Sequence, residues 1–85
     1  MTTRRTEPET DEVAGPARID TRGLKCPWPV LRAAREMRQH EAILLLADDP
    51  VALIDVPALA QAHGWSLDVR ELPGHAEFRI GRPRT

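Results

Sequence analysis

Hydrophobic and polar positions divide the chain into a polar N-terminal segment and a patterned remainder. Residues 1–16 carry mixed charges and prolines without an apolar run, and this composition predicts a flexible tail. Residues 17–82 alternate short apolar runs with segments of helical periodicity. A stretch of this length predicts one small domain.

The first predicted strand and the first predicted helix flank a short loop. Residues 17–21 are predicted as a strand, and residues 22–25 as a loop in which Gly23 permits unusual backbone angles. Pro27 and Pro29 then favour a helix start, because the amide that proline lacks has no partner in the first helical turn. The 3,4 spacing predicts one apolar helix face made of Val30, Ala33, Ala34 and Met37.

A buried strand and a second helix are predicted next. Residues 43–47 are all apolar and end at the turn Asp48-Asp49-Pro50, which is typical of a central strand. The second helix is predicted to open at Val56-Pro57 with Asp55 as its N-cap, because aspartate accepts hydrogen bonds from first-turn amides. Gly64 is predicted to end this helix, since glycine adopts the left-handed conformation of a C-terminal cap.

The remaining residues predict a hairpin. Residues 65–70 and residues 76–80 each alternate apolar with polar side chains, which is the period of a strand with one buried face. Pro73-Gly74 supplies the turn between them. Trp65 and Phe78 are therefore predicted to lie in the core.

The predicted order of elements is β-α-β-α-β-β. Each βα unit implies parallel strands, and the closing hairpin implies an antiparallel pair, so the four-stranded sheet is mixed. In so short a chain both helices must cover the same face of the sheet. The predicted fold class is a two-layer α/β (α+β) sandwich.

Composition and charge argue against several classes of function. The net charge of -1 does not suit a protein that holds nucleic acid by a field of positive charge. No segment approaches the roughly 20 apolar residues of a membrane span, and the N-terminus lacks the apolar core of a secretion signal. We therefore predict a cytoplasmic protein without membrane association.

The single cysteine, Cys26, is the main candidate for chemistry. Its place at a predicted helix start, beside Pro27 and Pro29, offers unpaired amides and the positive end of the helix dipole, and both favour the thiolate. Arg22 and Lys25 add positive charge nearby. We predict a reactive, partly exposed thiol, and the alternative is a small buried cysteine in the core.

Three other uses of a cysteine lack support in the sequence. Disulfide exchange generally needs a second cysteine three residues on, where this chain has Pro29. A Cys–His catalyst needs a base within reach, whereas His40, His63 and His75 follow predicted elements remote from the helix start. No Cys/His spacing resembles a zinc site, and neither metal nor cofactor is expected. A lone activated thiol suits the acceptance and donation of a group, with sulfur the natural candidate.

The segment Cys26-Pro27-Trp28-Pro29 resembles the Cys-Pro-x-Pro signature of the TusA/SirA/YedF sulfur-carrier family. Residues 47–50 and then residues 55–57 resemble the second signature of that family, and the resemblance covers roughly residues 17–81. It implies the β-α-β-α-β-β fold with strand order 1-2-4-3. It also implies that the cysteine accepts and donates sulfur as a persulfide, in a carrier rather than a stand-alone turnover enzyme.

The same resemblance implies protein partners on both sides of the carrier. Sulfur donors in the family include cysteine desulfurases and rhodaneses. Acceptors include DsrE/TusD-like proteins that feed tRNA 2-thiouridine synthesis, and the sulfur-oxidation machinery of some organisms. Carriers of this size are expected to act as monomers.

Residues around the cysteine have two kinds of expected role. The residues expected to shape the site are Arg22, Gly23, Lys25, Pro27 and Pro29. Trp28 is either an exposed partner anchor, since tryptophan is enriched in interface hot spots, or folds back on its own sheet. Asp48 and Asp49 either contact a partner or cap and turn the chain before Pro50.

Two hypotheses from other classes stay open. The domain could be a non-catalytic interaction or regulatory module that uses Trp28, with Cys26 incidental. RNA binding is the weaker of the two, because the net charge counts against it. The surface that either hypothesis would use is a predicted helix face, otherwise simply solvated, that carries Arg32, Arg35 and Arg38.

Overall fold

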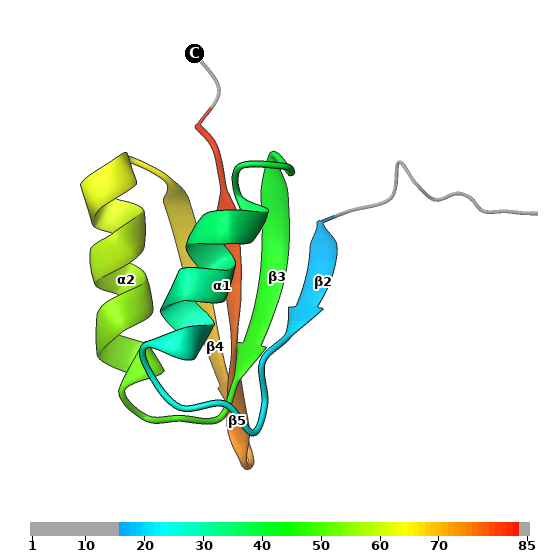
Figure 1. Cartoon of the computed structure of the whole chain (residues 1–85), viewed down its shortest axis with the longest axis vertical. Helices are drawn as coiled ribbons and strands as arrows, with labels where there is room; N and C mark the ends of the chain where they lie inside the picture. The colour runs from blue at the N-terminus through cyan, green and yellow to red at the C-terminus, as the bar shows by residue number, and fades with distance from the viewer. Residues whose placement is uncertain (1–15, 84–85) are drawn as a thin grey trace, which may run out of the picture.

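The computed structural model describes residues 16–83, so the predicted tail lies almost wholly outside the described residues. Within these described residues, four strands and two helices follow one another in the predicted order (Figure 1). These elements are β2 (Ala17–Asp20), α1 (Trp28–Glu36), β3 (Ala42–Ala47), α2 (Ala52–His63), β4 (Ser66–Leu72) and β5 (His75–Gly81).

The sheet is mixed, with the strand order β2-β3-β5-β4. Strand β2 runs parallel to β3, with Ile19 opposite Leu45, and β3 runs antiparallel to β5, with Leu45 opposite Phe78. Strand β4 completes the sheet as the antiparallel neighbour of β5. Both helices cover one face of this sheet (Figure 1). The predicted two-layer α/β sandwich and the strand order implied by the family resemblance are therefore confirmed.

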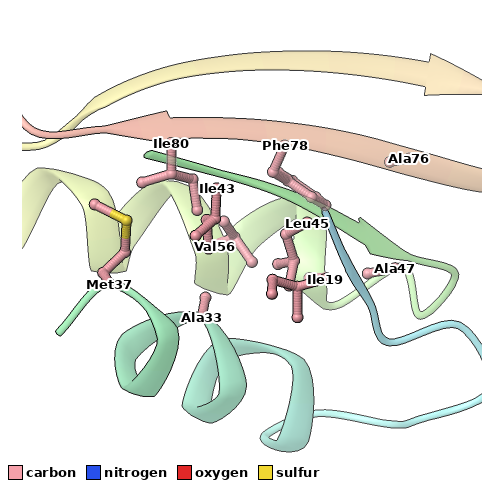
Figure 2. Close-up of a cluster of buried hydrophobic side chains, with 11 residues drawn as sticks. Ile19, Ala33, Met37, Ile43, Leu45, Ala47, Val56, Ala76, Phe78 and Ile80 are labelled. Carbon is pink, nitrogen blue, oxygen red and sulfur yellow. The ribbon is translucent and has the colours of Figure 1, made fainter. Parts of the chain in front are cut away.

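The hydrophobic core lies between this sheet face and the two helices (Figure 2). Phe78 on β5 is fully buried at its centre, as predicted. Around it lie Ile43 and Leu45 from β3 and Val56 from α2. Truncation of a buried phenylalanine costs about 3–5 kcal/mol of unfolding free energy, so one residue carries a large part of this small domain's stability.

Helix α1 presents its predicted apolar face to the core. Ala33 and Met37 are fully buried, while Val30 and Ala34 are half-buried. The helix begins at Trp28, directly after Pro27. Pro29 is also buried, so this proline packs as well as starting the helix.

Helix α2 begins earlier than the sequence predicts. Its first residue is Ala52, so Asp55 lies in the first turn rather than at the N-cap, and Pro57 lies inside the helix. The turn that starts it is made by Asp49, whose backbone carbonyl accepts the Ala52 amide at 2.9 Å. Gly64 ends the helix as predicted, with a positive φ of 70° that glycine adopts without steric cost.

The strand predicted from residue 65 is present as β4, but its buried face is only partial. As an edge strand β4 leaves Val69 exposed and Leu67 half-buried. Trp65 precedes the strand and is half-buried against the core rather than inside it. Its ring stacks on His63, with the ring centroids 4.3 Å apart, and the Arg82 guanidinium lies 5.9 Å from its centroid.

Within residues 16–83, neither helix is long and apolar enough to cross a membrane.

Candidate functional site

Cys26 lies where the carboxyl ends of the two parallel strands meet the starts of both helices. Strand β2 leads through residues 21–27 into α1, and β3 leads through residues 48–51 into α2. Because β2 and β3 are parallel neighbours, the two connections lie at the same edge of the sheet (Figure 1). Ligand and reaction sites of open α/β sheets form at such edges.

Asp48, in the β3–α2 connection, binds the backbone of the β2–α1 connection. Both of its carboxylate oxygens accept the Gly23 amide, each at 3.0 Å. Gly23 has a positive φ of 89°, a conformation that other L-residues rarely adopt, so glycine at this position lets the backbone turn its amide toward the carboxylate.

Asp49 fastens the same loop three residues further on. Its Oδ2 accepts the Cys26 amide at 2.7 Å, and its Oδ1 accepts the Val51 amide at 3.0 Å. These two amides hold the pKa of the Asp49 carboxyl below its usual value, with Lys25 contributing a smaller effect. The carboxylates of Asp48 and Asp49 thus already have backbone partners, which favours the structural alternative for both residues.

The Cys26 thiol is half-buried and packs against the edge of the core. Burial raises its pKa, and the negative charges of Asp49 and Asp55, together with a hydrogen bond to the Asp55 carboxylate, raise it further. The predicted thiolate-favouring environment is therefore wrong for the isolated chain. A raised pKa means that the sulfur is a neutral thiol at neutral pH, and a thiol is a much weaker nucleophile than a thiolate.

The reason lies in the local backbone. Helix α1 begins only at Trp28, Pro27 has no amide hydrogen, and the Trp28 amide donates to the Lys25 carbonyl at 2.9 Å. Pro29 likewise has no amide hydrogen, so few donors of the first turn are available to the thiol, while the charges of two carboxylates oppose its ionisation.

The two predicted basic neighbours act elsewhere. The Arg22 guanidinium pairs with Asp20 through Nε at 2.9 Å and through the second nitrogen at 2.7 Å, and this pairing holds the pKa of the Asp20 carboxyl well below its usual range. Lys25 is exposed beside Cys26, and its charge acts on Asp49. Neither residue contributes to the shift of the thiol's pKa.

Trp28 points to solvent, with 61% of its surface exposed. The alternative that it folds back on the sheet is wrong. It lines an open groove of about 380 Å³ together with Leu24 and Leu31, which are also exposed, and with Arg32 and Arg35. Neither leucine was predicted as a site residue. The spacing of three between Trp28 and Leu31 places these two side chains on one face of the helix.

Asp55 is the site residue that the sequence argument missed, because it was assigned to the N-cap. Asp55 lies in the first turn of α2, and its negative charge raises the pKa of the Cys26 thiol. The sequence does contain a signal for this role. Asp55 follows a predicted parallel strand, and the helices that follow two parallel strands start at the same edge of the sheet. The Asp55 carboxylate also stabilises the positive end of the α2 dipole.

Histidine and metal chemistry gain no support at this edge. His40 follows α1 and His63 ends α2, so both lie away from the cysteine. His75 begins β5 and lines a groove with Asp48 and Asp49, yet it is not among the groups that act on the thiol. Residues 16–83 contain no group of three His, Cys, Asp or Glu side chains placed to hold a metal ion.

Comparison with known proteins places this geometry in a family. The family model for sulfurtransferase TusA matches residues 17–82. Among solved structures, a SirA-like protein from Desulfitobacterium hafniense superposes with a TM-score of 0.73 at 23% sequence identity, over 80% of this chain and 99% of that chain. This structural likeness supports the fold. Because the family model covers most of the sequence, the chain belongs to the TusA family of sulfurtransferases.

Proposed function

We propose that Cys26 carries sulfane sulfur as a persulfide between a donor protein and an acceptor protein. The observation that carries the proposal is the position of the only cysteine, half-buried at the edge where both helix starts converge. Members of the TusA family act as sulfur carriers with partner proteins. In this chain a transferred sulfur has one thiol on which to reside.

The transfer needs no oxidant or reductant. The Cys26 sulfur loses its proton and attacks the terminal sulfur of a donor persulfide, so a new S–S bond forms as the donor's S–S bond breaks. The donor leaves as a thiolate and takes up a proton. Cys26 then bears a persulfide, and an acceptor thiolate removes the terminal sulfur by the same exchange, which returns Cys26 to the thiol.

The test is the intact mass of the protein after incubation with a cysteine desulfurase and cysteine, or with a rhodanese and thiosulfate. We expect an added mass of one sulfur atom on the wild type and none on Cys26→Ser. Reducing agent should remove the added mass. An unloaded wild type with active donors, or equal loading of Cys26→Ser, would overturn the proposal.

The groove lined by Leu24 and Trp28, two residues that flank Cys26 in the sequence, is proposed as the docking surface for a donor or acceptor. Trp28 and Leu31 offer an apolar anchor, and Arg35 forms no ion pair with another described residue. A partner segment with an apolar side chain flanked by carboxylates would complement these groups. We expect the partners to be a cysteine desulfurase or rhodanese on the donor side and a DsrE/TusD-like or sulfur-oxidation protein on the acceptor side.

The loop residues are proposed to shape the site. Gly23 supplies the amide bound by Asp48, while Pro27 and Pro29 frame the helix start. Arg22 and Lys25 are proposed to add to the charge that a partner meets at this edge. We also propose that Asp48 and Asp49 contact a basic group of a partner, in addition to accepting their backbone hydrogen bonds.

A non-catalytic interaction module on the same fold is the second candidate, and the exposure of Trp28 favours it. The two functions differ in which variant abolishes the cellular phenotype. Persulfide transfer requires that Cys26→Ser abolish it. An interaction module requires that Cys26→Ser preserve it and that Trp28→Ala abolish it.

A further inference from the structure

The carboxylate of Asp49 binds the backbone of Cys26 and also contributes negative charge near its side chain. Asp49 accepts the Cys26 amide at 2.7 Å and the Val51 amide at 3.0 Å, so it ties the residues that precede α1 and α2 to one another. Hydrogen bonds to a charged acceptor are stronger than neutral ones. The position of Cys26 therefore depends on Asp49 directly.

The charges that reach the thiol are negative. Asp49 approaches it from the β3–α2 connection and Asp55 from the first turn of α2, and both oppose the thiolate. The other charged or titratable groups at this edge are Lys25, which acts on Asp49, Asp48, which binds Gly23, and His75, which lines the groove beneath both aspartates. The groups that shift the pKa of the thiol are carboxylates, and Lys25 acts on Asp49 instead.

We propose that Asp49 is a positioning residue that fixes the Cys26 backbone and places a negative charge beside its side chain. The inference deepens the proposed sulfur-carrier function, because it concerns the same sulfur atom.

The test is the pH dependence of Cys26 alkylation by iodoacetamide, compared between the wild type and Asp49→Asn. An asparagine oxygen can still accept one of the two backbone amides, while the charge and the second acceptor are gone. We expect the midpoint of the alkylation profile to fall by about one pH unit, the effect typical of one nearby charge.

This shift has a signature that altered accessibility cannot produce. Below the midpoint, a fall of about one unit raises the thiolate fraction roughly tenfold, while the lower basicity of the sulfur slows each thiolate about threefold. Asp49→Asn should therefore react about threefold faster at neutral pH and about threefold slower on the alkaline plateau, so that the two profiles cross. A variant that only loosens the loop would be faster at both.

Asp48→Asn is the matched control, because it removes the adjacent carboxylate that binds the same loop through Gly23. The alkylation profile of Asp48→Asn should keep the wild-type midpoint. Asp49→Glu, which retains the negative charge at position 49, should have a midpoint close to that of the wild type. If Asp49→Asn fails to fold, Asp49→Ser removes the charge while leaving a short oxygen acceptor, with circular dichroism as the check on folding. Equal midpoints for the wild type and the folded uncharged variant would overturn the inference. That result would leave the sulfur-loading test unaffected, because alkylation requires no donor.

Discussion

The carboxylate of Asp49 and the amide of Cys26 form a 2.7 Å hydrogen bond between residues 23 positions apart in the sequence. This contact sets where the chain enters the first helix relative to the point where it enters the second. Asp49 is also the neighbour of Asp48, which binds the same loop at Gly23. Two consecutive side chains therefore organise the site, and several consequences can be measured.

The first prediction concerns acid. The pKa of Asp49 is lowered in the fold by the amides of Cys26 and Val51, so its charged form contributes stability above the ordinary value of 3.8. That contribution is lost as the pH falls through 3.8 toward the lower folded pKa. Asp49→Asn should melt at a lower temperature than the wild type at pH 7 but lose less on acidification. Thermal melts from pH 7 downward measure this, and parallel curves would contradict it.

Trp28→Ala should weaken transfer without weakening the fold. The side chain is exposed, so we expect a change in unfolding free energy of less than about 0.5 kcal/mol. Loss of an interface hot spot of about 2 kcal/mol would raise the KM for the carrier in donor-dependent loading roughly thirtyfold. Val69→Ala, which truncates another exposed apolar residue on β4, should leave this KM unchanged. Equal changes in KM for the two variants would show that Trp28 does not belong to the docking surface.

Phe78→Ala should destabilise the domain by about 3–5 kcal/mol, because a fully buried aromatic ring leaves a cavity at the centre of the core. Arg79→Ala alters the next residue of β5, whose side chain is exposed, and should cost less than about 0.5 kcal/mol. Urea titrations followed by circular dichroism compare the two. A small loss for Phe78→Ala would mean that the sheet and helices close over the vacated space.

Gly23→Ala and Gly64→Ala should have the same effect on stability but different effects on the site. Both glycines have positive φ, and a Cβ at either would meet no atom within 4 Å, so the cost is that of the backbone conformation, about 1–2 kcal/mol. Gly23 is bound by Asp48 in the Cys26 loop, whereas Gly64 ends α2. Only Gly23→Ala should change the rate of Cys26 alkylation. A change in both would indicate a global effect.

The fold could be predicted from the sequence because its signals are local. Three local patterns each predict their own element: the apolar run of β3, the alternation of β5 and the apolar face of α1. The start of α2 could not be placed, because Asp49 and Asp55 are both plausible helix-start residues, and the backbone turn at Asp49 decides between them. The partial burial of β4 depends on its place at the edge of the sheet, which follows from pairing rather than from alternation.

The place of Cys26 just before a proline-framed helix start could be predicted from the sequence, whereas the charges around its thiol could not. Cys26 and its proline-framed loop could be identified from sequence spacing. The state of its sulfur depends on which groups lie near it in space, and the carboxylates of Asp49 and Asp55 come from a different connection. The basic residues beside Cys26 in the sequence were expected to favour the thiolate, yet Arg22 is held by Asp20.

The sulfur-bearing edge lies opposite both ends of the described chain. Strand β2 starts, and β5 finishes, at the end of the sheet away from the loops that hold Cys26 (Figure 1). Residues 16 and 83, the limits of the described chain, therefore both lie away from the loops that hold Cys26 (Figure 1). The fold thus leaves the Cys26 end of the sheet unobstructed by the segments that lead into and out of the described domain (Figure 1).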